Sequence, residues 1–93
     1  MSSSDVTWYV YLLECADGTL YTGITIDPQR RVRQHAAGRG ARYTRTRLPV
    51  RLVGKVSAGT RGDALRLEKR IKRRAPRDKR AYFAGTRPSR RVG

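Results

Sequence analysis

The sequence predicts a small α/β (α+β) domain, in which a mainly antiparallel three-stranded sheet is covered by helices in the order β-β-α-β-α-α. Three observations predict this class. Two β-branched and aromatic runs flank an Asp-Gly turn near the N-terminus, a third alternating run follows, and two segments with helical apolar spacing each begin at a capping residue. A chain of 93 residues is expected to build one hydrophobic core.

The first two strands are predicted over residues 7–13 and 20–26. Both runs are rich in tyrosine, threonine, valine, leucine and isoleucine, which suit a pleated, half-buried surface. Asp17-Gly18 lies between them and is a strong turn signal. The two strands should therefore form a hairpin.

A helix is predicted to begin at Pro28 and to run to about Ala37. Asp27 can accept hydrogen bonds from the free N–H groups of the first turn, and proline suits the first helical position. Gly38 provides a natural end. Residues 38–49 are expected to form a basic loop, and the alternation in residues 50–56 predicts the third strand.

A second helix is predicted over residues 61–74, because Thr60 and Asp63 form a capping-box pattern and Pro76 marks the end. Residues 77–84 are expected to form a short third helix. In this organisation residues 1–6 are a flexible N-terminus, residues 7–84 are the domain, and residues 85–93 are a disordered basic tail.

Charge is distributed very unevenly along the chain. Residues 1–27 contain four acids and no Lys or Arg, whereas residues 28–93 hold all 22 basic residues and three acids, so that −4 and +19 add to +15. This excess favours a polyanionic partner, because each neutralised phosphate releases counterions. An anionic membrane is disfavoured, since no basic amphipathic helix carries bulky aromatics. One cysteine and the lack of a signal-peptide pattern predict a cytoplasmic protein.

Tyr11 and Tyr21 stand on the two predicted hairpin strands, and the turn decides whether they meet. A two-residue turn would pair Tyr11 with Ile24 and place Tyr21 on the opposite face. A three-residue loop at residues 16–18 would pair Tyr11 with Gly23 and bring both tyrosines to one face, because a one-residue slip flips every side chain. Strand tyrosines are also common in plain packing, so the residues leave the question open.

Arg31 and His35 are four residues apart on the first predicted helix and share a face. Val32 and Ala36 are expected to mark the buried stripe, with the Arg–His pair beside it. This arrangement suits the edge of a cleft, and it equally suits a solvated arginine next to an ordinary histidine.

Glu68 is the sharpest anomaly in the sequence. Ala64, Leu67 and Ile71 form an apolar stripe at helical spacing, and at about 100° per residue Glu68 falls inside it. A buried carboxylate is costly unless it is paired. Glu68 therefore either pairs with Lys72, one turn further along, or faces a site where a bound cation compensates its charge.

The basic loop at residues 38–49 interleaves arginines with one aromatic residue, Tyr43. The guanidinium group of arginine can donate two parallel hydrogen bonds to phosphate oxygens. Glycines let the protein backbone come close to a bound partner, and a tyrosine ring can stack on a base. A solvated flexible loop is the plainer interpretation.

Separated blocks along the chain together resemble the GIY-YIG nuclease superfamily, in particular its small single-domain members, which are related to the N-terminal nuclease domain of excinuclease C. Residues 9–11 (YVY) and 21–23 (YTG) resemble the two half-motifs. Residues 27–35 are similar to the catalytic helix, residues 38–44 to a segment typical of the small members, and residues 64–72 to the metal-binding helix.

The resemblance implies roles for five residues. Tyr11 and Tyr21 match the tyrosines of the two half-motifs, and the resemblance slightly favours Tyr11 as the base. Arg31 matches the arginine that contacts the scissile phosphate, His35 stands where relatives place His or Tyr, and Glu68 matches the single carboxylate that holds the metal. The residues expected to bind nucleic acid are Arg30, Arg39, Arg42, Tyr43, Arg45, Arg47 and Lys72.

The expected function is therefore a metal-dependent endonuclease that uses Mg²⁺ or Mn²⁺ to hydrolyse phosphodiester bonds, with structured or branched DNA in repair or recombination as the favoured substrate over RNA. A non-catalytic nucleic-acid-binding module of the same fold is the alternative. A basic structural protein of a ribonucleoprotein particle explains the charge but not Glu68. A larger protein that supplies specificity is a further candidate partner.

Overall fold

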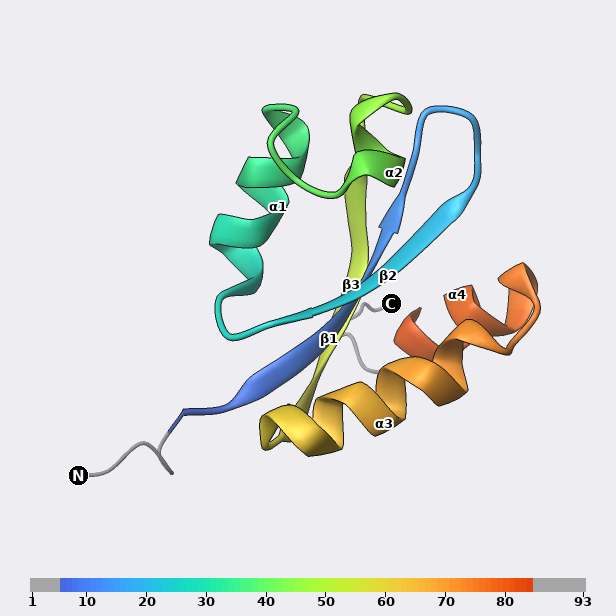
Figure 1. Cartoon of the computed structure of the whole chain (residues 1–93). Helices are drawn as coiled ribbons and strands as arrows, with labels where there is room; N and C mark the ends of the chain where they lie inside the picture. The colour runs from blue at the N-terminus through green and yellow to red at the C-terminus, as the bar shows by residue number, and fades with distance from the viewer. Residues whose placement is uncertain (1–5, 85–93) are drawn as a thin grey trace, which may run out of the picture.

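The computed structural model of the chain describes residues 6–84. The predicted fold class is confirmed, because the structure is a three-stranded antiparallel sheet with helices packed around it (Figure 1). The elements are β1 (Trp8–Glu14), β2 (Leu20–Thr25), α1 (Pro28–Ala36), α2 (Arg42–Arg45), β3 (Arg51–Gly59), α3 (Arg61–Lys72) and α4 (Pro76–Ala84). The tail predicted over residues 85–93, and all of the predicted N-terminal segment except Val6, lie outside the described residues.

The predicted element order was wrong at one point, because α2 lies where a loop was expected. The order is β-β-α-α-β-α-α. Residues 38–49 show no apolar helical spacing, and α2 is a single turn held by the backbone and side chain of Thr44, which contact the Ala41 carbonyl. The third strand also extends to Gly59 rather than Val56, because its pairing with β1 continues to Trp8.

The hairpin register answers the question that the sequence left open. β1 is the central strand of the order β2-β1-β3, and it pairs Tyr11 with Gly23 and Leu13 with Tyr21. Cys15 N–H donates to the Thr19 carbonyl at 2.9 Å, which closes a three-residue loop whose Gly18 has a φ of 85°. The two tyrosines therefore share one face of the sheet.

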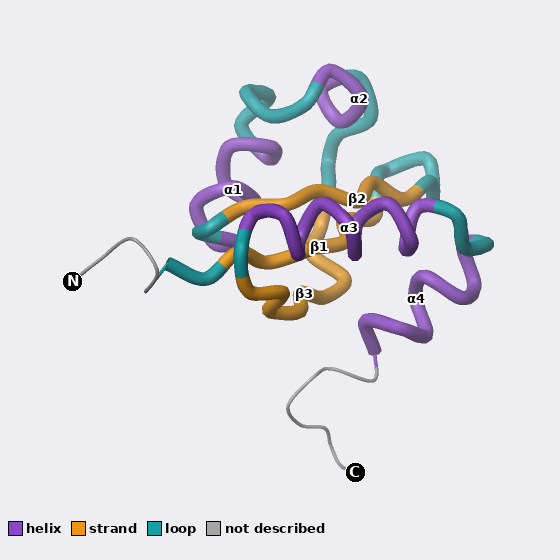
Figure 2. Tube along the Cα trace, turned by 60° about the horizontal axis from the view of Figure 1, so that its bottom comes forward, coloured by secondary structure: helices purple, strands orange, loops and turns teal. Residues whose placement is uncertain are grey.

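The hydrophobic core lies on the opposite face, beneath α3 and α4. Val10 and Leu12 of β1 pack there with residues of β3, α3 and α4. Figure 1 shows α1 and α2 on one side of the strands and α3 and α4 on the other, and in the turned view of Figure 2 α3 crosses in front of the strands. Alternation along β1 thus places Val10 and Leu12 in the core and turns Tyr11 toward α1 and α2. No helix of the described residues is long and apolar enough to cross a membrane.

The helix ends follow the capping signals. Asp27 Oδ1 accepts a hydrogen bond from Arg30 N–H at 3.1 Å at the start of α1, and Gly38 follows its end with a φ of 80°. Thr60 and Asp63 form the predicted capping box of α3. α3 ends at Lys72, two residues before the predicted end, and α4 begins at Pro76 itself.

Glu14 at the end of β1 ties two neighbouring elements to the central strand. Its carboxylate oxygens lie 2.6 Å from the Arg51 guanidinium of β3 and 3.0 Å from the Arg80 guanidinium of α4. Both arginines lower the pKa of Glu14, and the hydrogen bond from Arg80 is the largest cause. This pair of contacts helps to dock α4 against the sheet.

Candidate active site

Tyr11 lies at the centre of the candidate site, on the central strand. Its residue is only 1% exposed, and its ring passes over Gly23 of the neighbouring strand. A Cβ at Gly23 would overlap the Tyr11 hydroxyl, so only glycine at that position leaves room for the ring. The glycine of the second half-motif therefore has a direct steric role in seating the tyrosine of the first.

A chain of hydrogen bonds links Tyr11 to α1 and α2. The Tyr11 hydroxyl lies 2.9 Å from His35 Nε2, and His35 Nδ1 lies 2.8 Å from Thr44 Oγ1. The Thr44 hydroxyl in turn lies 3.0 Å from the Ala41 carbonyl oxygen. His35 and Thr44 are both completely buried, so these bonds form away from bulk water.

The predicted buried stripe of α1 was wrong. Ala36 is exposed, whereas His35 and Pro28 are the buried residues of the helix. His35 is drawn inward by Tyr11 and Thr44, and a Cβ at Gly40 would overlap its ring, so the backbone after α1 packs directly on the imidazole. These are tertiary contacts, and helical spacing carries no information about them.

Tyr21 extends the cluster toward the basic segment. Its ring centroid lies 6.3 Å from that of Tyr11 and 5.3 Å from that of His35. On its other side it stacks with Tyr43 of α2 at 6.0 Å, and the Arg47 guanidinium lies 3.9 Å from the centre of the Tyr43 ring. Of the two hairpin registers that the sequence allows, the structure has the one that brings Tyr11 and Tyr21 together.

Burial and one arginine set the protonation of the cluster. Burial raises the pKa of Tyr11 to about 12, while the charged Arg31 guanidinium acts in the opposite direction. Burial also lowers the pKa of His35 to about 4, and the charge of Arg31 contributes to that decrease. The phenol and the imidazole are therefore both neutral at pH 7.

Glu68 occupies the position in α3 that the helical stripe predicted. Its side chain is 17% exposed, between the buried Ala64 and Ile71. One carboxylate oxygen lies 3.4 Å from the Lys72 ammonium, so the predicted pairing is present. Its charge also raises the pKa of Tyr11, which means that it acts on the cluster as well. The two interpretations of Glu68 are thus compatible.

The donor set fits a magnesium-type ion rather than a metal held by a cage of side chains. Within residues 6–84 there is no group of three or more His, Cys, Asp or Glu side chains that can ligate one ion. A single hard carboxylate, with water in most other positions, matches the preference of Mg²⁺ for retaining its hydration shell. Glu68, whose side chain is largely buried and whose charge acts on Tyr11, is the carboxylate suited to this role.

The predicted nucleic-acid contacts fall into two groups. Arg30, Arg39, Arg42, Arg45 and Lys72 are exposed, and Tyr43 is 37% exposed. Arg47 is instead engaged within the protein, where its Nε lies 3.1 Å from Asp17 Oδ2 and its Nη1 donates to the Tyr43 carbonyl at 3.0 Å. A phosphate that binds Arg47 would have to compete with Asp17.

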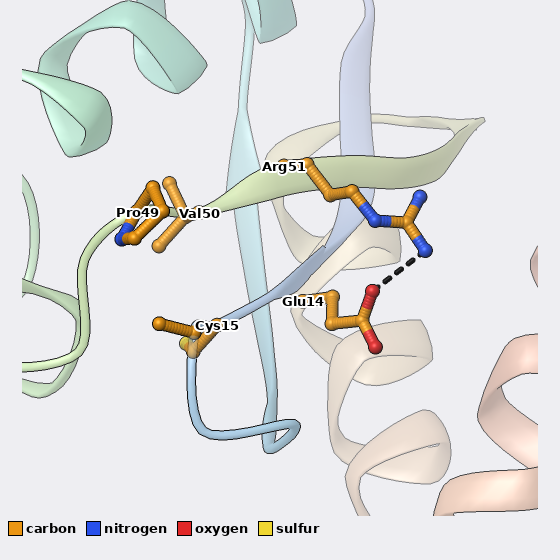
Figure 3. A pocket seen from close by; sticks show the side chains of 6 residues that line it. Glu14, Cys15, Pro49, Val50 and Arg51 are labelled. Atoms are coloured by element: carbon orange, nitrogen blue, oxygen red, sulfur yellow. Dashed lines mark ion pairs between the residues drawn. The ribbon is translucent and has the colours of Figure 1, made fainter.

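A hollow of about 220 Å³ lies elsewhere, between the end of β1 and the start of β3 (Figure 3). It contains none of the five predicted catalytic residues. Figure 3 shows the Arg51 guanidinium turned toward the Glu14 carboxylate at its rim. Burial raises the pKa of the Cys15 thiol there, so the reactive thiolate is disfavoured. We interpret this hollow as a packing feature.

Sequence reasoning gave no role in positioning the site to three residues, namely Gly23, Gly40 and Thr44. Each acts through a contact with a residue distant in the chain or on another element. The glycines had a weak signal, since glycine inside a strand pattern indicates close backbone approach. No sequence pattern predicted the buried position of Thr44, because it lies in a segment without apolar periodicity.

Comparison with known proteins identifies the family of this chain. The model of the GIY-YIG catalytic domain matches residues 7–81. A UPF0213 protein from Cupriavidus necator is 48% identical over 82 residues, which cover 88% of this chain and 89% of that protein. A UPF0213 protein from Nitratidesulfovibrio vulgaris is 53% identical over 81 residues, which cover 87% and 74%.

Solved structures give the same result. The solution NMR structure of a UPF0213 protein from Bacillus halodurans has a TM-score of 0.53 at 42% identity, covering 86% of this chain and 85% of that one. That of a protein from E. faecalis has a TM-score of 0.59 at 31% identity, covering 94% and 93%. GIY-YIG nucleases act on nucleic acid and generally depend on a divalent metal. The chain belongs to the GIY-YIG family, among the small single-domain UPF0213 proteins.

Proposed function

We propose that this protein is a metal-dependent endonuclease that hydrolyses phosphodiester bonds in structured or branched DNA, in repair or recombination in the cytoplasm. The observation that carries the proposal is the buried hydrogen bond of 2.9 Å between Tyr11 and His35. Arg31 acts electrostatically on both residues, and Glu68 acts on Tyr11. A phenol and an imidazole in contact, with a guanidinium and a carboxylate that act electrostatically on the phenol, are groups suited to the hydrolysis of a phosphodiester.

Arg31 is the proposed phosphate-binding residue. Its side chain is held by a hydrogen bond of 2.9 Å to Gln34 Oε1 and is only partly buried, so its guanidinium is oriented and reachable. It would donate charge-assisted hydrogen bonds to a non-bridging oxygen of the scissile phosphate. The bound anion would also offset the Arg31 charge that lowers the pKa of His35, so that substrate binding makes the imidazole more basic.

Tyr11 and His35 are the proposed proton acceptors. With a pKa of about 12, Tyr11 does not carry a stable negative charge at neutral pH. The attacking water would instead give a proton to the Tyr11 oxygen as the phenol proton passes to His35 Nε2. The water oxygen then bonds to phosphorus and the bond to the leaving oxygen breaks. This relay favours Tyr11 over Tyr21 as the base.

Glu68 is the proposed ligand of Mg²⁺ or Mn²⁺. A divalent cation at that carboxylate supplies positive charge that stabilises the leaving oxygen and the pentavalent phosphate. Lys72 lies 3.4 Å from the same carboxylate, and it is 55% exposed, so it can move aside at small cost.

The proposal is tested with the purified chain on a panel of duplex, flapped, bulged and branched DNA and on matching RNA. We expect cleavage of at least one structured DNA in Mg²⁺ or Mn²⁺, and none in EDTA. Binding without cleavage across all substrates and both metals would favour the alternative, a nucleic-acid-binding module that retains the fold. Cleavage that persists in EDTA would contradict the metal dependence.

Binding should weaken steeply as salt rises, with a log–log slope of about −0.9 for each phosphate neutralised on duplex DNA. Reversing the charge of the exposed Arg42 and Arg45 on α2 should make the slope less steep, by about 0.9 for each phosphate that is no longer neutralised. Fluorescence anisotropy at several salt concentrations measures this. The matched control reverses Arg73 and Arg77, which changes net charge equally near α3 and α4. Equal slopes for the two double variants would exclude α2 as the surface that binds DNA.

A further inference from the structure

The hydrogen-bond chain through the site has a direction that its two ends determine. At one end is Arg31, whose guanidinium has only donors and whose positive charge acts on the Tyr11 hydroxyl. At the other end is the Ala41 carbonyl, which can only accept and which lies 3.0 Å from Thr44 Oγ1. Between them stand three side chains, Tyr11, His35 and Thr44, with bonds of 2.9 Å and 2.8 Å.

Each hydroxyl in the chain has one proton, so the direction can be followed from both ends. The Tyr11 hydroxyl proton is repelled by the positive Arg31 guanidinium and has His35 Nε2 as its acceptor at 2.9 Å. Thr44 gives its proton to Ala41 and therefore accepts from His35 Nδ1. A neutral imidazole carries one N–H, and this pattern places it on Nδ1. The imidazole is neutral at pH 7, because burial lowers the pKa of His35 to about 4.

The opposite tautomer leaves a buried group unsatisfied. With the proton on Nε2, His35 would donate to the Tyr11 oxygen, and the Tyr11 hydroxyl proton would have no acceptor in this chain of bonds. Tyr11 is 1% exposed, so water does not readily replace that acceptor. The Ala41 carbonyl already accepts from the backbone N–H of Thr44 and Arg45, each at 3.1 Å, and adds the Thr44 hydroxyl only as a further donor. The preference for the Nδ1–H tautomer of His35 therefore depends on the hydrogen bond of the Tyr11 hydroxyl as well as on that of Thr44.

We propose that Thr44 is a positioning residue that holds His35 in the Nδ1–H tautomer, so that Nε2 is free of a proton and faces the Tyr11 hydroxyl. This inference rests on the proposed nuclease function only for its effect on cleavage. Thr44 never touches the substrate in this proposal and acts through His35 alone. Its side chain is completely buried on α2, where Gly40 lets the backbone approach the other face of the imidazole.

The tautomer can be measured directly, because His35 is the single histidine of the chain. A tag-free protein labelled with ¹⁵N-histidine gives signals from this one imidazole. We expect the wild type at pH 7 to show a protonated, pyrrole-like Nδ1 and a bare, pyridine-like Nε2. A protonated Nε2 in the wild type would overturn the proposal without any variant, whatever the outcome of cleavage assays.

Two substitutions separate the hydroxyl from the shape of the side chain. Thr44→Val keeps the volume and removes the hydrogen-bonding oxygen, whereas Thr44→Ser keeps the oxygen and loses a methyl group. We expect Thr44→Ser to retain the Nδ1–H tautomer and Thr44→Val to shift the population toward Nε2–H. An unchanged tautomer in a folded Thr44→Val protein would contradict the proposal. If Thr44→Val does not fold, the wild type and Thr44→Ser spectra decide.

Cleavage kinetics add a readout that packing alone would not change. General acid–base groups contribute about 10²–10⁴-fold to a rate, so a partial loss of the correct tautomer should lower kcat at least about tenfold in Thr44→Val. In Thr44→Val, KM should stay close to its wild-type value and the pH profile of kcat should change. Thr44→Ser should keep both kcat and the pH profile close to those of the wild type. Equal losses in the two variants would indicate packing and overturn the positioning role.

Discussion

Glu68→Gln is expected to abolish metal-dependent cleavage while leaving nucleic-acid binding intact. The substitution preserves the shape of the side chain and removes the charge that would hold a divalent cation. A catalytic metal contributes several kcal/mol, and at about 1.4 kcal/mol for each tenfold change the loss should be roughly 10²–10³-fold or more. Binding should hold or tighten slightly, because the net charge rises from +15 to +16.

Stability distinguishes a ligand from a structural partner. If Glu68 serves mainly as a ligand, the melting temperature of Glu68→Gln without metal should hold or rise, since a largely buried carboxylate is costly. If Glu68 serves mainly as the partner of Lys72, the variant should be less stable and its folded fraction should still cleave. The charge control is Asp78→Asn in the first turn of α4, which raises the net charge equally outside the cluster. Full cleavage by folded Glu68→Gln would refute the metal-ligand assignment.

Tyr11→Phe should cause the second large loss, and it should exceed the loss in Tyr21→Phe. Removing the Tyr11 hydroxyl deletes the group between the attacking water and His35 Nε2, and general base catalysis is worth about 10²–10⁴-fold. Tyr21→Phe keeps its ring contacts with Tyr11 and His35, which involve the ring rather than the hydroxyl. Single-turnover rates at saturating DNA measure both variants.

The tyrosine comparison also has a stability control. Tyr11→Phe leaves the buried Nε2 of His35 without its donor, which should cost about 1–3 kcal/mol of unfolding free energy. Urea unfolding of both variants shows whether the loss of cleavage occurs in folded protein. A larger rate loss in Tyr21→Phe than in Tyr11→Phe would indicate that Tyr21 is the general base. It would also contradict the proposed proton transfer from Tyr11 to His35.

Local physical chemistry made much of this fold predictable from the sequence alone. Capping residues identify helix starts through contacts only three residues long, as at Asp27 and Thr60. The anomaly at Glu68 was also local, because helical geometry places it inside an apolar stripe without reference to any other element. The uneven distribution of charge can be seen in the sequence without any structure, and it indicates a polyanionic partner.

The tertiary structure decided how these elements meet. The sequence allowed two hairpin registers, and only the packed sheet selects the one that brings Tyr11 and Tyr21 to one face. His35 was expected beside the buried stripe of α1, but contacts from β1 and α2 draw it fully inside. Thr44 lies in a single helical turn that apolar periodicity does not predict. The buried Thr44 hydroxyl and its hydrogen-bond partners stabilise this turn. Side-chain contacts between distant segments depend on register and close backbone approach, and these emerge only when the whole chain packs.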